Sequence, residues 1–73
     1  MKVKELLERK EIKVIKECNG YYLCEYKGNE IEIQHNDANI NPTYSLYING
    51  KTIMTKAYIT TCISKILNLK EEK

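Results

Sequence analysis

The chain has 73 residues, of which 42% are hydrophobic and 30% are charged, and its formal net charge is +2. This length leaves room for one domain, residues 1–73, and this composition argues against an intrinsically disordered chain. The charge is unevenly distributed, with +2 in residues 1–17, −3 in residues 18–50 and +3 in residues 51–73, and an acidic middle argues against nucleic-acid binding through a central sheet.

The cysteines and the first residues of the chain bear on its cellular compartment. Three cysteines are present, and the start Met1-Lys2-Val3-Lys4-Glu5 lacks the apolar core of a secretory signal peptide. No stretch of the sequence reaches the length of a membrane span. We therefore expect a cytoplasmic protein with free thiols and no association with a membrane.

The first part of the chain predicts a short helix followed by a strand. A helix over residues 3–10 is indicated by apolar residues that recur on one helical stripe: Val3, Leu6 and Leu7. A strand from about Glu11 is favoured by a run of β-branched residues: Ile12, Val14 and Ile15.

Asn19-Gly20 predicts a turn into a second strand, Tyr21–Tyr26. With a simple two-residue loop, the face that holds Tyr22 and Cys24 would hold Ile15 in place of Val14. An additional residue in the loop, as in a bulged hairpin, moves the apolar residues of the first strand onto that face: Ile12 and Val14, beside Tyr22, Cys24 and Tyr26. We therefore expect the bulged hairpin.

The rest of the sheet is predicted by three segments. Lys27-Gly28-Asn29 predicts a turn, and Glu30–Gln34 is an alternating strand with one polar face. Residues 35–42 are rich in Asn and Asp, which favour an irregular segment. Thr43–Ile48 and the return strand, Lys51–Thr55, then flank Asn49-Gly50, the strongest hairpin signal in the chain.

A two-residue loop at Asn49-Gly50 also predicts the register of this last hairpin. Ile48 would face Lys51, Leu46 would face Ile53 and Tyr44 would face Thr55. Four residues would then share one face of the sheet: Tyr44, Leu46, Ile48 and Ile53. The segment that follows predicts a helix whose single apolar stripe can cover this face: Ile59, Cys62, Ile63 and Ile66.

Together these elements predict an α+β fold in the order helix, five strands, helix. We expect an antiparallel sheet of four or five strands, flanked by a short N-terminal helix and a longer C-terminal helix. Both helices are expected on one face of the sheet, so that the other face stays partly exposed.

The sequence does not predict an enzyme, a cofactor or a metal site. His35, two residues before Asp37, lies among turn-forming residues, which indicates a solvated loop histidine more than a general base. Zinc sites typically have cysteine pairs two to four residues apart, whereas Cys18, Cys24 and Cys62 are widely spaced. Cys62 lies in the apolar stripe of the last helix, where a cysteine is usually a small buried hydrophobic residue.

The tyrosines are the most distinctive feature, with six in the chain and no Phe or Trp. Tyr21 and Tyr47 alternate to the face opposite the predicted core, where we expect Ser45, Thr52 and Met54 beside them. Tyrosine and methionine are enriched at protein interfaces because they give a large contact area at low entropic cost. These five residues are the candidate protein-binding site, with ordinary surface tyrosines as the alternative.

Three lysines near the last helix form a second candidate site. Lys51, Lys56 and Lys65 lie near its start and middle, and a helix N-terminus with nearby lysines can hold a phosphate. They are the candidate nucleic-acid contacts, with solubility as the alternative explanation.

Two functions follow as hypotheses. The first is a small non-enzymatic module that binds another protein. Compact proteins of this composition are often carried by phages or other mobile elements, where many inhibit a host protein, for example a defence nuclease. The second is a small nucleic-acid-binding domain that uses the basic termini and the start of the last helix.

The sequence also predicts association, because a 73-residue core supplies limited stability. The strand Thr43–Ile48 has no charged residue and, at the edge of the sheet, would pair with another chain. We therefore expect a homodimer or a tight complex with a protein partner rather than a lone monomer.

Overall fold

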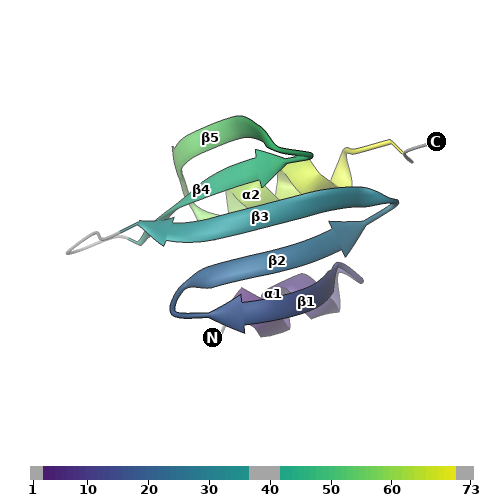
Figure 1. The fold of residues 1–73 in the computed structure, drawn as a ribbon, viewed down its shortest axis with the longest axis horizontal. Coiled ribbons are helices and arrows are strands. Elements are labelled where there is room, and N and C mark those ends of the chain that lie inside the picture. The colour runs from purple at the N-terminus through teal and green to yellow at the C-terminus, as the bar shows by residue number, and fades with distance from the viewer. Residues whose placement is uncertain (1–2, 37–41, 71–73) are drawn as a thin grey trace.

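The computed structural model describes residues 3–36 and 42–70 of the chain (Figure 1). Within them lie two helices and five strands: α1 (Val3–Arg9), β1 (Lys13–Cys18), β2 (Tyr21–Tyr26), β3 (Asn29–Asn36), β4 (Thr43–Ile48), β5 (Lys51–Ala57) and α2 (Ile59–Leu67). The strands form one antiparallel sheet in the order β1-β2-β3-β4-β5. The predicted α+β fold is confirmed.

Both helices cover the same face of the sheet, as predicted. In Figure 1 they lie behind it, α1 behind β1 and β2, and α2 behind β3 to β5. The core between the layers consists of the following buried residues: Val3, Leu7, Ile12, Tyr22, Cys24, Ile31, Ile33, Tyr44, Leu46, Ile48, Cys62, Ile63 and Ile66. Neither helix within the described residues is long and apolar enough to cross a membrane.

Two-residue turns join three pairs of neighbouring strands. Asn19-Gly20, Lys27-Gly28 and Asn49-Gly50 all have positive φ at both residues, which is the geometry of a type I′ hairpin turn. Gly20 is required for a second reason, because a Cβ at this position would lie 3.0 Å from the Cβ of His35. The turn signals in the sequence therefore identify these connections, except that Asn29, predicted in the second turn, is the first residue of β3 and pairs with Tyr26.

The first hairpin is bulged, but its extra residue lies in the strand and not in the loop. Cys18 pairs with Tyr21 across a two-residue turn, and the register shifts between Val14 and Lys16. Ile15 is the unpaired residue and is 54% exposed. The bulge brings Val14 opposite Cys24, on the covered face, so the predicted faces are confirmed while the predicted place of the insertion is wrong.

The last hairpin corrects the predicted register. Ile48 pairs with Lys51 as expected, but register shifts in β5 pair Leu46 with Met54 and Tyr44 with Ala57. Ile53 and Thr55 therefore do not occupy the predicted positions opposite Leu46 and Tyr44. Each bulge adds a residue to β5, so the alternation of faces that a regular strand would keep is broken.

The position of β4 overturns the argument for pairing through an uncharged edge. Thr43–Ile48 lies between β3 and β5, whereas the edges are β1 and β5. Both edge strands contain lysines and bulges, which are features that discourage pairing with another chain. Self-association of this protein would therefore need a different surface.

The strand β3 is longer than predicted and includes His35 and Asn36. His35 is thus not a loop residue: its backbone N–H donates to the Gly20 carbonyl at 2.8 Å, and its ring packs edge to face on Tyr44 with 5.1 Å between the centroids. Asp37, its predicted neighbour, lies outside the described residues.

Candidate functional site

The face of the sheet that neither helix covers is the candidate site and is called the open face below (Figure 1). Residues that pair across an antiparallel sheet point to the same side, so the register determines its members. Beginning at β1, these are Lys13, Lys16, Cys18, Tyr21, Leu23, Glu25, Glu30, Glu32, Gln34, Asn36, Thr43, Ser45, Tyr47 and Thr52.

Glu32 lies at the centre of this face, on the middle strand of the sheet. It pairs with Leu23 on one side and with Tyr47 on the other. The hydroxyl of Tyr21 donates a hydrogen bond to Glu32 Oε2 at 2.6 Å. All four side chains are partly buried although no helix covers them, so they shield one another from solvent. A carboxylate is thus held in place among two aromatic rings and one aliphatic side chain.

The contact with Glu32 changes the acidity of Tyr21. The hydrogen bond to the carboxylate is the main cause that raises the pKa of Tyr21 from 10.0 to about 12, and desolvation adds to it. The carboxylate stabilises the phenol and repels the phenolate. The pKa of Tyr21 in the folded state lies above its unfolded value, so this contribution to stability is present below pH 10 and is lost as the pH rises through about 12.

Changing Glu32 to Gln is expected to lower the pKa of Tyr21 from about 12 toward 10, because the negative charge near the phenol is removed. The measurement is an NMR pH titration of the Tyr21 ring carbons. Glu25→Gln is the control, since Glu25 also lies on the open face but does not bond Tyr21, and we expect no change there. An unchanged Tyr21 titration in Glu32→Gln would contradict the contact.

The acidic charge of the open face is concentrated on β3. Glu30 pairs with Glu25 on β2, and two carboxylates directly opposite each other destabilise a sheet. Lys13 pairs with Glu25 from the other side, but Lys16 is separated from Glu32 by Leu23. The lysines therefore lie on β1 at the edge, while Glu30 and Glu32 give the centre of the face a negative potential.

Ser45 is part of a polar cluster at the other end of the open face. Its hydroxyl donates to Asn36 Oδ1 at 3.1 Å and is 3.3 Å from the Thr55 carbonyl oxygen, and the Asn36 amide donates to the same carbonyl at 2.8 Å. Thr55 lies where the register of β5 shifts. The bulge removes the Thr55 carbonyl from the regular hydrogen-bond ladder between the strands, and the side chains of Asn36 and Ser45 provide its hydrogen-bond donors instead. Ser45 therefore has a structural role.

The structure brings together some of the five predicted interface residues. Tyr21, Tyr47, Ser45 and Thr52 lie on the open face. Met54 does not: the bulge at Ile53 turns it onto the covered face, where it pairs with Leu46 and packs against the core. Leu23 and Glu32 belong to the site but were not predicted. Alternation along Tyr21–Tyr26 would have identified Leu23, whereas the role of Glu32 depends on the pairing of β2 with β3.

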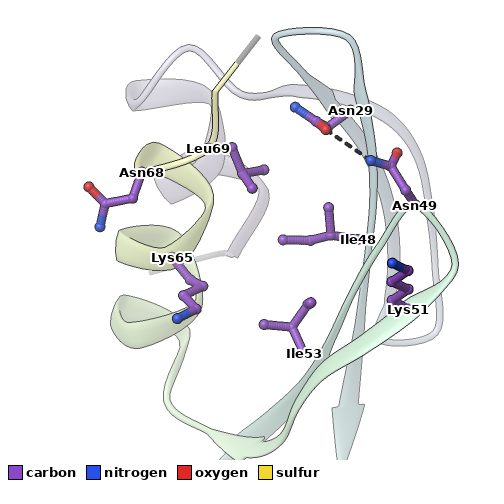
Figure 2. Close-up of a pocket in the computed structure, with 8 residues that line it drawn as sticks. All are labelled: Asn29, Ile48, Asn49, Lys51, Ile53, Lys65, Asn68 and Leu69. Carbon is purple, nitrogen blue, oxygen red and sulfur yellow. Dashed lines mark hydrogen bonds between the residues drawn. The ribbon is translucent and has the colours of Figure 1, made fainter. Parts of the chain in front are cut away.

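The three predicted phosphate-binding lysines separate into two groups. Lys51 and Lys65 line one pocket of about 420 Å³ between the β4–β5 hairpin and α2 (Figure 2), and Lys56 does not line it. The pocket interior is formed largely by aliphatic side chains: Ile48, Ile53 and Leu69. An aliphatic interior is poorly suited to the sugar and phosphate of a nucleic-acid backbone.

The cysteines and the histidine do not form a site in the described structure. Cys18 is exposed, while Cys24 and Cys62 are buried in the core. Within residues 3–36 and 42–70, no group of three or more His, Cys, Asp and Glu side chains is arranged to hold a metal ion.

Comparison with known proteins provides no relative from which a function could be inferred. The chain matches no protein-family model, no curated protein sequence and no solved structure.

Proposed function

We propose that this chain is a small non-enzymatic module whose open face binds a basic surface of another protein. The observation that carries the proposal is the cluster around Glu32, in which a carboxylate is fixed between Tyr21, Leu23 and Tyr47. Tyrosine anchors surrounding an oriented charge are typical of the energetically important centre of an interface. The carboxylate would pair with an Arg or Lys of the partner.

The charge of the open face indicates the kind of partner. Glu30 faces Glu25, a repulsive arrangement that costs stability in the isolated chain and becomes favourable against a basic surface. Proteins that bind nucleic acids have basic surfaces of this kind. We therefore propose, as one concrete form, an inhibitor of phage or mobile-element origin that covers the nucleic-acid-binding surface of a host defence nuclease. Such an inhibitor would act by covering a surface, so the proposal assigns no catalytic role to the described residues of the interface.

Changing both Tyr21 and Tyr47 to Ala is expected to weaken partner binding by about 100-fold or more, because each ring would be an anchor at the centre of the interface. The wild-type chain first captures its partner from a host lysate, and the affinity of the purified partner is then measured for each variant. Tyr58→Ala is the matched control, since Tyr58 is 55% exposed but lies outside the open face. Equal affinity of the double variant and the wild type would contradict the proposed face.

Salt and sedimentation measurements separate this proposal from its alternatives. Binding of a basic protein partner should weaken with salt and also with Glu32→Lys, whereas binding of nucleic acid should strengthen with that change.

The nucleic-acid function would be favoured if the chain were retained on duplex or single-stranded nucleic acid at low salt and the variant Lys51→Glu/Lys56→Glu were not retained. A mass that rises over a hundredfold range of concentration would instead show that the partner is a second copy of the chain.

A further inference from the structure

The pocket between the β4–β5 hairpin and α2 has a composition that the proposed protein interface does not explain. Its apolar side chains come from three parts of the chain, Ile48 on β4, Ile53 on β5 and Leu69 after α2. In Figure 2 these three lie between the helix and the hairpin, flanked by Lys65 on the helix and Lys51 on β5. The open face is on the opposite side of the sheet.

A bulge places Ile53 in this pocket. Thr52 pairs with Tyr47 and Met54 pairs with Leu46, so Ile53 is the extra residue between them. In a regular strand it would lie opposite Leu46 in the core, but here it borders the pocket and is 38% exposed. Bulges commonly redirect a side chain beside a functional site. An aliphatic side chain left this accessible next to a cavity provides apolar surface for a ligand.

The charge of the pocket is positive. Its lining contains Lys51 and Lys65 and no Asp or Glu, and neither lysine forms an ion pair with another residue of the described chain. The remaining polar groups of the lining are amides, those of Asn29, Asn49 and Asn68. The pocket therefore combines an aliphatic interior with one lysine on each of two opposite walls, and either lysine can pair with an anion.

The walls of the pocket are fixed by hydrogen bonds. Asn49 Nδ2 donates to Asn29 Oδ1 at 2.9 Å, and the Asn29 amide donates to the Lys70 carbonyl at 3.1 Å. These bonds join the β4–β5 turn and the β2–β3 turn to the segment after α2 that contains Leu69. Because these hydrogen bonds hold the walls together, a ligand would enter a preformed cavity and cause little reorganisation.

We propose that this pocket binds an aliphatic monocarboxylate, with its alkyl chain against Ile48, Ile53 and Leu69 and its carboxylate at the rim, paired with Lys51 or Lys65. A carboxylate matches the positive charge of the pocket rim, and an unbranched alkyl chain matches an interior formed by aliphatic side chains. The site is independent of the open face.

The test uses octanoate as the probe, with binding followed by backbone amide NMR shifts of the full chain. We expect saturable shifts at Ile53, Lys65 and Leu69, with a dissociation constant on the order of 100 µM from the usual efficiency of small ligands. Octanol, which lacks the charge, and acetate, which lacks the chain, should each bind at least about tenfold more weakly.

Three variants test the two halves of the site separately. The double variant Lys51→Gln/Lys65→Gln should weaken octanoate binding by about tenfold and leave octanol binding unchanged. Ile53→Thr should weaken both ligands by about threefold to tenfold. Lys56→Gln is the matched control, an exposed lysine of β5 outside the pocket, and should change neither. The proposal is overturned by absent shifts at millimolar octanoate, by shifts confined to another part of the chain, or by octanol binding as tightly as octanoate.

Discussion

Replacing Asn29 with Ala is expected to lower the free energy of unfolding by about 2–3 kcal/mol, a large share of the roughly 5 kcal/mol typical of a small domain. Asn29 is only 4% exposed, and its amide donates to the carbonyls of Tyr26, Lys27 and Lys70 at 3.2, 3.3 and 3.1 Å. Its Oδ1 accepts from Asn49. Removing this side chain takes a hydrogen-bond partner from the carbonyls of Tyr26, Lys27 and Lys70 and from the Asn49 amide, in bonds that are partly buried.

Asn49 is the second half of this arrangement. Besides bonding Asn29, its Oδ1 accepts from the Glu30 backbone N–H at 2.9 Å. Asn49→Gly removes these bonds but preserves the positive φ of the turn, and we expect a loss of about 1–2 kcal/mol. The double variant Asn29→Ala/Asn49→Gly should lose less than the sum of the single losses, because the two residues share one hydrogen bond.

Urea unfolding measures these losses, and the chain contains a matched control. Asn19 precedes Gly20 in an Asn-Gly turn with nearly the same φ angles, but it lies at the exposed end of the β1–β2 hairpin. Asn19→Gly should change the free energy of unfolding by less than about 0.5 kcal/mol. If Asn29→Ala lowered the free energy of unfolding no more than Asn19→Gly, the hydrogen bonds that Asn29 forms with Asn49 and Lys70 would have no role in stability.

Only one of the three thiols is expected to react with a thiol reagent in the folded protein at pH 8. Cys18 is exposed, whereas Cys24 and Cys62 are 0% exposed in the core. Burial also raises the pKa of Cys24 and Cys62 from 9.0 to about 11, which lowers the amount of reactive thiolate. Their reaction requires the chain to open and should be about 1,000-fold slower than that of Cys18 or more.

Disulfide-exchange kinetics with an aromatic disulfide reagent check this expectation. Cys18→Ser should remove the fast phase, and denaturant should make the remaining thiols react at comparable rates. Asn29→Ala should accelerate the slow phase by about 30-fold to 150-fold, the factor that corresponds to its loss of stability when opening is fast relative to reaction. If two or three thiols of the wild-type chain reacted in the fast phase, this result would contradict the burial of Cys24 and Cys62 in the core.

The raised thiol pKa values also predict a loss of stability at alkaline pH. The folded state disfavours the thiolates of Cys24 and Cys62, so their contribution to stability is present below pH 9 and decreases as the pH rises toward about 11.

The sequence by itself determined the elements of this protein, because their signals are local. Asn19-Gly20 and Asn49-Gly50 identify two turns through the positive φ that such a turn requires. The apolar stripes of the helices, including Leu7 and Cys62, identify the faces that are buried. Alternation along the strands assigned Tyr21 and Tyr47 to the open face.

The tertiary structure alone decided the register of the strands and the groups that the register brings together. The bulges at Ile15 and Ile53 follow from how both layers pack, and no local residue pattern specifies where an extra residue is accommodated. One such bulge moves Met54 into the core and Ile53 to the pocket. The contact of Tyr21 with Glu32, and the pocket shared by Lys51 and Lys65, join residues far apart in the chain. Contacts of this kind depend on strand pairing and helix placement, which are determined by burial of the whole core and not by any segment alone.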